Sequence, residues 1–188
     1  LGLLIDVEPD GIPDPNAMGD DNNNSDDEDG VWWPCNFVPG HKTTIQVTAS
    51  AAGFLNAWFD FNANGSWAEA GEQIFINTAL IPGVNYLSIT VPPTALIGPT
   101  FARFRFSTQL GLSFTGPAQD GEVEDYQFLI EAAVPLDYGD APDPNYPTLA
   151  ASDGARHAQG PPVGVFMGNL VDYELNGQPN AFASGDIP

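Results

Sequence analysis

The chain has 188 residues, of which 43% are hydrophobic and 11% are aromatic, so it can hold one ordinary domain with extensions and supply that domain with a core. Four Lys and Arg residues stand against 25 Asp and Glu residues, and the formal net charge of −21 would repel a phosphate backbone or an anionic membrane surface. These numbers exclude nucleic acid as a partner, and no apolar run is long enough for membrane insertion. The single cysteine, Cys35, cannot form an internal disulfide.

The first 30 residues are acidic and carry no apolar periodicity after Val7. By composition alone this segment is as typical of a disordered acidic linker as of a cation-binding segment. Part of it recurs at the other end of the chain, because residues 2–20 and 168–186 share nine identities without a gap, at an offset of 166. We interpret this recurrence as a little more than one period of a tandem array, cut in mid-repeat at both ends.

From Val31 onward, short apolar or alternating runs are separated by Gly and Pro turns. Strands are predicted at residues 43–49, 54–61, 73–77, 86–91, 101–107 and 123–130. The breaks fall at residue pairs 39–40, 52–53, 82–83, 92–93, 98–99 and 116–117. Alternation places Ile45 and Val47 on one strand face. Six or seven short strands without an amphipathic helix predict an all-β, antiparallel β-sandwich, and this pattern does not separate an Ig-like from a jelly-roll-like topology.

Residues 60–72 have the order of a calcium loop. Oxygen-bearing side chains stand at the first, third and fifth positions, glycine at the sixth, and carboxylates at the tenth and thirteenth. The predicted ligands are the side chains of Asp60, Asn62 and Asn64, the backbone carbonyl of Ser66, and Glu69 or Glu72 as the closing carboxylate. An EF-hand closes at position twelve and follows a helix, so we expect a calcium loop on a β-scaffold. The alternative is a polar hairpin in which Asn64 and Gly65 form the turn.

A second group of acids gathers at the start of the last predicted strand: Asp120, Glu122, Glu124 and Asp125. Strand alternation puts Glu122, Glu124 and Tyr126 on one face. Like charges two residues apart need a neighbouring cation, and two candidates remain open. One is a metal ion shared with the loop at Asp60, and the other is the pair Arg103 and Arg105 on a neighbouring strand. Both can hold at once.

Four stretches together resemble the GEVED domain, a module of large secreted and surface proteins of bacteria and archaea: residues 55–62 (LNAWFDFN), 72–75 (EQIF), 102–107 (ARFRFS) and 121–126 (GEVEDY). Residues 26–31 and 137–143 resemble the segments that flank this domain in tandem arrays. The resemblance implies a β-sandwich in a repetitive extracellular protein and implies little chemistry.

This resemblance favours metal binding over disorder in the first 30 residues. A second calcium cluster is then expected from acids of this segment: Asp6, Asp20, Asp26, Asp27 and Asp29. The chain divides into an acidic, metal-ordered segment (1–30), a β-sandwich (31–134) and the start of the next repeat (135–188).

We expect a calcium-stabilised structural repeat of an extracellular filament, surface layer or adhesin, assembling head to tail with copies of itself. No catalytic residue is predicted, because His41 and His157 have no neighbour at triad or zinc spacing, and the acids expected to bind metal are not placed around a substrate cleft. The alternative is a carbohydrate-binding module that contacts surface glycans through exposed aromatic rings, for which Trp32 and Trp33 are candidates and Trp58 is expected to be buried.

Overall fold

The computed structural model describes residues 1–2, 13–17, 29–134, 136–158, 171 and 173–185. The elements are β1 (Val31–Trp32), β2 (Lys42–Ala49), β3 (Gly53–Phe59), β4 (Gln73–Leu80), β5 (Gly83–Thr90), β6 (Gly98–Ser107), β7 (Glu122–Ile130), β8 (Leu136–Tyr138), the 3-10 turn η2 (Ala150–Ser152) and β9 (Arg156–Ala158). All six predicted strands are present. Within these residues there is no α-helix and no helix long and apolar enough to span a membrane.

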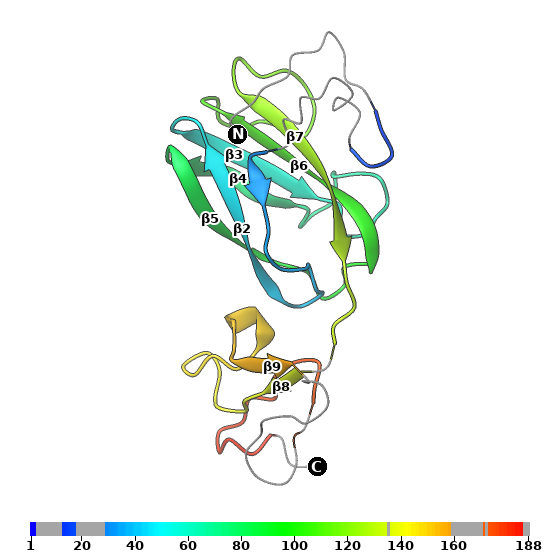
Figure 1. Ribbon diagram of the computed structural model, residues 1–188, viewed down its shortest axis with the longest axis vertical. Coiled ribbons are helices and arrows are strands. Elements are labelled where there is room, and N and C mark those ends of the chain that lie inside the picture. The colour runs from blue at the N-terminus through cyan, green and yellow to red at the C-terminus, as the bar shows by residue number, and fades with distance from the viewer. Residues whose placement is uncertain (3–12, 18–28, 135, 159–170, 172, 186–188) are drawn as a thin grey trace.

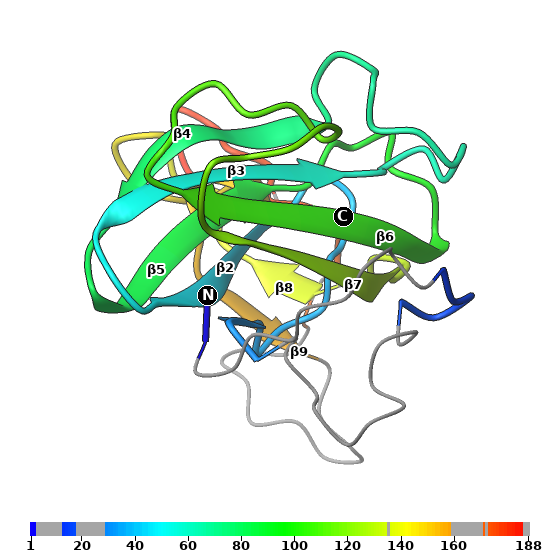
Figure 2. The same cartoon turned by 90° about the horizontal axis from the view of Figure 1, so that it is seen from above.

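Two antiparallel sheets face each other (Figures 1 and 2). One has the strand order β1-β2-β5, and the other has the order β4-β3-β6-β7. An Ig-like sandwich divides its strands in this way, with the first, second and fifth strands in one sheet and the third, sixth and seventh in the other. Here β4 extends the second sheet beside β3. The order therefore resolves the topology that the sequence left open in favour of an Ig-like sandwich.

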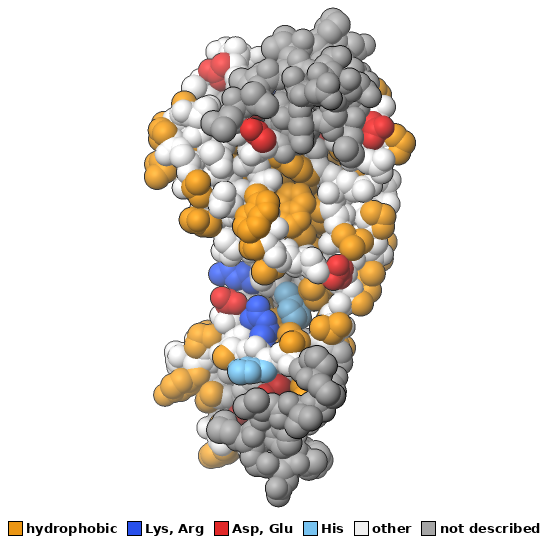
Figure 3. Space-filling view, viewed as in Figure 1, with side chains coloured by type: hydrophobic (Ala, Val, Ile, Leu, Met, Phe, Trp, Pro, Cys, Tyr) orange, Lys and Arg blue, Asp and Glu red, His pale blue; other side chains and the backbone are white. Residues whose placement is uncertain are grey.

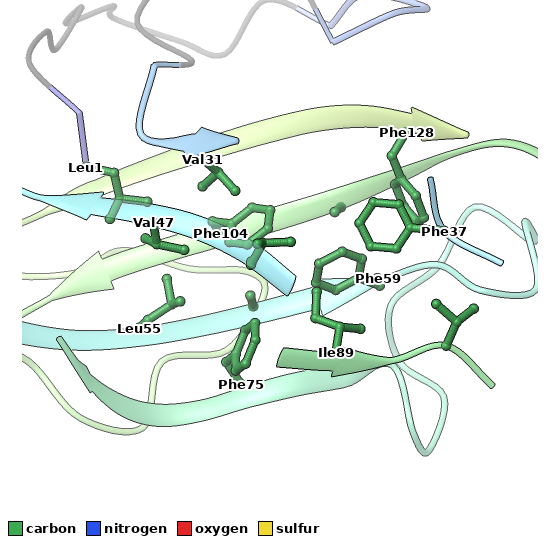
Figure 4. Close-up of a cluster of buried hydrophobic side chains, with 14 of the residues drawn as sticks. Leu1, Val31, Phe37, Val47, Leu55, Phe59, Phe75, Ile89, Phe104 and Phe128 are labelled. Carbon is green, nitrogen blue, oxygen red and sulfur yellow. The ribbon is translucent and has the colours of Figure 1, made fainter. Parts of the chain in front are cut away.

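The core lies between the two sheets and is rich in Phe (Figure 4). Strand β2 contributes Ile45 and Val47, both 0% exposed, which confirms the predicted alternation. The Phe59 ring packs against Phe104 and Phe128, with ring centroids 5.5 and 5.4 Å apart. These edge-to-face contacts add to the burial of apolar area in joining the two layers.

One predicted break is wrong. Gly98 and Pro99 were expected to form a break before the strand at residues 101–107, yet both belong to β6 and pair with Ile130 and Leu129 of β7. Proline removes a backbone donor and is tolerated where a strand is paired on one side only. Strand β3 reaches β6 only at Ala102, so the first residues of β6 have β7 as their single neighbour.

Residues 136–158 and 173–185 form a small unit beyond the end of the sandwich, which we call the C-terminal lobe (Figure 1). It contains the β8–β9 pair and η2, and Glu174 forms a bridge with Leu136. The lobe contacts its own sandwich where η2 lies against β2 and where the rings of His41 and Tyr138 meet, with centroids 6.5 Å apart. It extends from the sandwich rather than covering a sheet (Figure 1).

Candidate metal sites

The loop of residues 60–72 follows β3 and leads into β4, and both of its ends are fixed to the sandwich. The backbone N–H of Asp60 donates to the carbonyl of Phe101 (3.0 Å), and the hydroxyl of Thr100 donates to the carbonyl of Asp60 (2.7 Å). At the other end, the N–H of Phe59 donates to the carbonyl of Glu72 (2.9 Å). The first and last carboxylates of the loop are therefore held close to the sheet, where Asp60 is 4% and Glu72 is 3% exposed.

Inside the loop, the side-chain oxygens are drawn toward the turn. The Asp60 carboxylate accepts the N–H groups of Asn64 (3.2 Å) and Gly65 (2.9 Å). Gly65 has φ +81°, a left-handed conformation that glycine adopts without strain. Asn62 Oδ1 accepts the same Asn64 N–H (3.0 Å), and Asn64 Nδ2 donates to Glu69 Oε1 (3.0 Å). The loop thus gathers most of the predicted ligands around one turn.

Ser66 has two roles in this turn. Its N–H donates to Asn64 Oδ1 (2.9 Å), and its hydroxyl accepts the N–H of Ala68 (3.1 Å). A hydrogen bond from Ser66 also contributes to the lowered pKa of Glu69, after the larger effect of the bond from Asn64. The side chain of Ser66 therefore belongs to the same polar group as the acids.

Glu72 differs from the other acids of the loop, Asp60 and Glu69, in its hydrogen bonding. Both of its carboxylate oxygens are buried and accept no hydrogen bond. Its pKa is raised to about 7, chiefly by burial and in smaller part by the neighbouring carboxylates of Glu69 and Asp60. A buried carboxylate without a donor is costly, and a proton or a bound cation relieves that cost. The chemistry of the donor set, which is entirely oxygen, suits a hard cation such as Ca²⁺.

Within the described residues, no three His, Cys, Asp or Glu side chains form a group that could hold a metal ion by themselves. The predicted loop site uses a different set, since it adds two Asn amides and a backbone carbonyl to the acids. Amide and carbonyl oxygens are ordinary calcium ligands. An ion in this loop would therefore depend on Asn62, Asn64 and Ser66 as much as on the carboxylates.

Two acids of the second group, Glu122 and Glu124, lie on one face of β7, as alternation predicted, and the structure shows that this face is buried. Glu124 is 1% exposed, whereas its neighbour Val123 is 48% exposed. The Glu124 carboxylate accepts the N–H of Gly30 (3.2 Å) and the hydroxyl of Tyr126 (3.1 Å). That hydroxyl accepts the N–H of Val31 (3.1 Å). Burial raises the pKa of Glu124 to about 7. These bonds attach the beginning of β1 to β7.

Two further acids of this group, Glu122 and Asp120, have different environments. The buried carboxylate of Glu122 accepts no hydrogen bond and forms an ion pair with the amino group of Leu1. Asp120 is exposed and accepts bonds from the Ser107 hydroxyl (2.6 Å) and the Thr108 N–H (2.8 Å), and these bonds lower its pKa. Asp120 therefore stabilises the loop between β6 and β7.

The structure keeps the two groups of acids apart. Glu124 lies opposite Phe104 on β6, whereas the loop at Asp60 begins beside Phe101. Three residues along a strand span about 10 Å. This placement does not fit a single ion shared by the Asp60 loop and Glu122 or Glu124.

Neither arginine is the cation expected beside Glu122 and Glu124, because Arg103 and Arg105 lie in register with Asp125 and Val123, on the other face of the sheet. Only Arg103 has a carboxylate partner. Arg103 makes a two-bond contact with Asp125 (2.7 and 2.6 Å), and its guanidinium lies 4.8 Å from the ring centre of Trp67. Arg105 donates instead to the carbonyls of Ser113 (2.6 Å) and other residues of the β6–β7 loop, so the prediction of a carboxylate partner is wrong for it. A long loop exposes carbonyls that need donors, and a buried guanidinium supplies several at once.

Four predicted ligands lie outside the described residues: Asp6, Asp20, Asp26 and Asp27. Asp29 is described and exposed, and its charge contributes to the raised pKa of Glu124. It is therefore the one member of the predicted second cluster that the structure places beside the β7 acids.

Two residues that carry the local geometry were not predicted. Asn56 is 0% exposed, and its Oδ1 accepts the N–H of Asn77 (3.0 Å) where the β3–β4 register shifts. Gly121 has φ +99°, and a Cβ there would lie 1.8 Å from the carbonyl oxygen of Phe106. The glycine before the acids of β7 was a visible signal for a close backbone approach.

The GEVED domain model matches residues 54–129, from β3 to the end of β7. The match covers the Asp60 loop, the two arginines of β6 and the inward acids of β7. Searches of curated proteins and of solved structures found no match to the chain.

Proposed function

We propose that this chain is a calcium-stabilised structural repeat or subunit that acts outside the cell, in a filament, a surface layer or an adhesin that assembles head to tail. The observation that carries the proposal is the Glu72 carboxylate, which is buried with both oxygens unpartnered at the closing position of an oxygen-rich loop. The match of the GEVED domain to residues 54–129 supports it through the surface proteins that carry this module.

Calcium is the ion that the loop suits best. Asp60 and Glu69 offer carboxylate oxygens with remaining lone pairs, and Asn62 and Asn64 offer amide oxygens. Magnesium requires near-ideal octahedral geometry and keeps several waters, whereas calcium accepts a larger and less regular oxygen set. Calcium modules outside cells bind in the range of 10⁻⁴ to 10⁻³ M, which matches a loop with few charges.

The acids beyond this loop support a structural role over a catalytic one. Asp125 pairs with Arg103, Asp120 holds the β6–β7 loop, and Glu124 anchors β1. His41 packs against Tyr138, and burial lowers its pKa. Asp125, Asp120, Glu124 and His41 thus have contacts that hold the fold together.

Calcium titration by isothermal calorimetry tests the site. Glu72→Gln keeps the size of the side chain and removes its charge, so we expect it to lose one calcium site per chain relative to the wild type. Glu131→Gln is the matched control, because Glu131 lies outside the loop and contacts Asn36. An unchanged number of bound ions in Glu72→Gln would remove the proposal for this loop.

A carbohydrate-binding function is the second candidate, and a different surface supports it. Trp32, Gln46 and Tyr86 are partners in register across β1, β2 and β5, so they form one row on the outer face of that sheet. Trp32 is 58% and Tyr86 is 72% exposed. With strands about 4.8 Å apart, the two aromatic residues stand roughly 10 Å from each other, with an amide between them. Figure 3 shows hydrophobic side chains gathered midway along the sandwich.

Trp33 does not share this face. Its ring packs edge-on against Phe37 and Tyr126, with centroids 5.7 and 5.5 Å apart, and Trp58 is buried as predicted. Glycan-array binding in the presence of calcium tests the row. Binding that falls in Trp32→Ala and in Tyr86→Ala, and stays unchanged in the control Tyr146→Ala, would support the candidate. No glycan bound by the wild type would remove it.

A further inference from the structure

The same backbone turn occurs at two places that are 166 residues apart. At Asp14, the side-chain Oδ1 accepts the N–H of Asn16 (2.8 Å) and the carbonyl accepts the N–H of Ala17 (3.2 Å). At Asn180, Oδ1 accepts the N–H of Phe182 (2.8 Å) and the carbonyl accepts the N–H of Ala183 (3.1 Å).

Both turns end on an alanine with a positive φ, 56° at Ala17 and 49° at Ala183. Non-glycine residues adopt this conformation rarely. A chance recurrence at the offset of the sequence repeat is therefore improbable, and we conclude that residues 13–17 and 179–183 are structural equivalents.

The second of these turns belongs to a segment that docks on the first half of the C-terminal lobe. Glu174 exchanges two backbone hydrogen bonds with Leu136 (2.9 Å each), and its Oε1 accepts the N–H of Tyr138 (3.2 Å). Farther along, the N–H of Asn180 donates to the carbonyl of Asp140 (2.7 Å), and the N–H of Gly185 donates to Asp140 Oδ2 (2.7 Å). The receiving surface is residues 136–150.

Close packing fixes the middle of this segment. Asn176 Oδ1 accepts the N–H of Ala150 (2.8 Å). Gly177 is buried, and a Cβ placed on it would lie 2.5 Å from the carbonyl oxygen of Thr148. Only glycine fits there without displacement of the backbone.

The features that make this docking possible are all present in the equivalent N-terminal residues. Glu174, Gly177 and Gly185 correspond to the identical residues Glu8, Gly11 and Gly19. The acceptors Asn176 and Asn180 correspond to Asp10 and Asp14. Residues 8–12 and 19 lie outside the described residues, so the comparison there rests on the sequence. The turn at residues 14–17 shows that the correspondence also holds for the backbone conformation.

We propose that residues 8–19 of one copy bind the 136–150 surface of another copy, in the place that residues 174–185 of that copy occupy. This inference deepens the proposed head-to-tail function, on which it rests, by naming the two surfaces that meet. Exchange of equivalent segments between identical chains forms contacts that the fold already contains.

The chain's own segment competes with the incoming one, since its tether gives it a high effective concentration. The 136–150 surface is therefore closed to partners until its own segment is displaced. Assembly by this route is expected to be slow in the wild type and to depend on protein concentration.

The test empties the surface by substitution. In Gly177→Val, the new side chain meets the Thr148 carbonyl and displaces the chain's own segment. We expect the full chain to shift from monomer to dimers and longer species in light scattering coupled to size exclusion, because residues 8–19 of another copy fill the surface. The double variant Gly11→Val with Gly177→Val is expected to remain a monomer, and Gly11→Val alone is the matched control.

A labelled peptide of residues 1–19 gives a second measurement. It is expected to bind Gly177→Val at least about tenfold more tightly than wild type, and to lose this gain when it carries the Gly11→Val change. Near-ultraviolet circular dichroism checks that the sandwich of each variant is folded.

Two results would overturn the inference: a Gly177→Val chain that stays monomeric and binds no peptide, or a double variant that associates equally. Both measurements are made in calcium and in EDTA, and also with Glu72→Gln. Loss of calcium binding without loss of exchange, or the reverse, separates the failure of one proposal from the failure of the other.

Discussion

Glu72, in the loop before β4, and Glu124, in β7, are two buried glutamates, and burial raises the pKa of each to about 7. They differ in their partners. Glu124 accepts the N–H of Gly30 and the hydroxyl of Tyr126, whereas neither oxygen of Glu72 accepts a hydrogen bond. A raised pKa alone therefore does not distinguish a structural acid from a candidate metal ligand, and hydrogen-bond satisfaction does.

This contrast also separates the motif from the proposed site. The acids of residues 121–126 are the most recognisable part of the sequence, and Glu124 among them is used to hold β1 against β7. The proposed calcium loop lies elsewhere and closes on Glu72. The one glutamate close to Glu72 in the sequence is Glu69. If the two glutamates differ in function as they differ in partners, their substitutions should affect stability and calcium binding differently.

The largest effect is expected at Glu124. Glu124→Ala leaves the Gly30 N–H and the Tyr126 hydroxyl without their acceptor in a buried place, so the free energy of unfolding should fall by about 3 kcal/mol. Glu124→Gln keeps an acceptor and should cost about 1 kcal/mol. Urea unfolding in calcium and in EDTA measures both. A loss seen only in calcium would make Glu124 a metal ligand and end the contrast.

Calcium removal should have the next largest effect. An ion at about 100 times its dissociation constant stabilises the folded chain by about 2.7 kcal/mol. We expect EDTA to lower the melting temperature of the wild type and to change Glu72→Gln little in comparison, with Glu131→Gln responding as the wild type does. Equal responses in Glu72→Gln and the wild type would place the stabilising ion elsewhere.

The pH dependence of the metal-free protein should show both glutamates. A carboxyl whose pKa is raised in the folded state binds its proton more tightly there, so its contribution is present below about pH 4.5 and is lost as the pH rises through about 7. The free energy of unfolding should therefore fall across this interval. Calcium should reduce the fall, because it stabilises the ionised form of Glu72. Denaturant unfolding at several pH values measures this, and an identical slope with and without calcium would contradict it.

The smallest effect is expected at Asp120. This exposed acid was a predicted ligand, yet its oxygens accept bonds from Ser107 and Thr108. Asp120→Asn keeps one acceptor, so it should lower the free energy of unfolding by about 1 kcal/mol and leave calcium binding unchanged. A loss of bound calcium in the titration would return Asp120 to the set of ligands.

Local patterns in the sequence were sufficient to predict the strands and the faces of their residues. Alternation predicted Ile45 and Val47 inside β2, and Glu122 and Glu124 on one face of β7. These predictions succeed because the side-chain period of a strand depends only on neighbours along the chain.

The features that the sequence left open depend on distant contacts. Strand order, which decided between two topologies, is set by pairings such as that of β2 with β5. The partner of Glu124 is Gly30, which is 94 residues away, and Arg105 binds loop carbonyls that no pattern marks. The start of β6 was mistaken for the same reason, since the proline there is tolerated only because β3 does not reach it.

The scarcity of basic residues has a consequence for protease resistance. Trypsin cleaves after Lys and Arg, and the chain has only four such residues. All of them lie in strands: Lys42 begins β2, Arg103 and Arg105 lie within β6, and Arg156 begins β9. A protease must bind its substrate as a free extended segment, and backbone that is paired in a sheet cannot enter the active site without local unfolding. A protein built in this way should outlast trypsin-like enzymes while folded, and its rate of digestion should report directly on how often the sheets open.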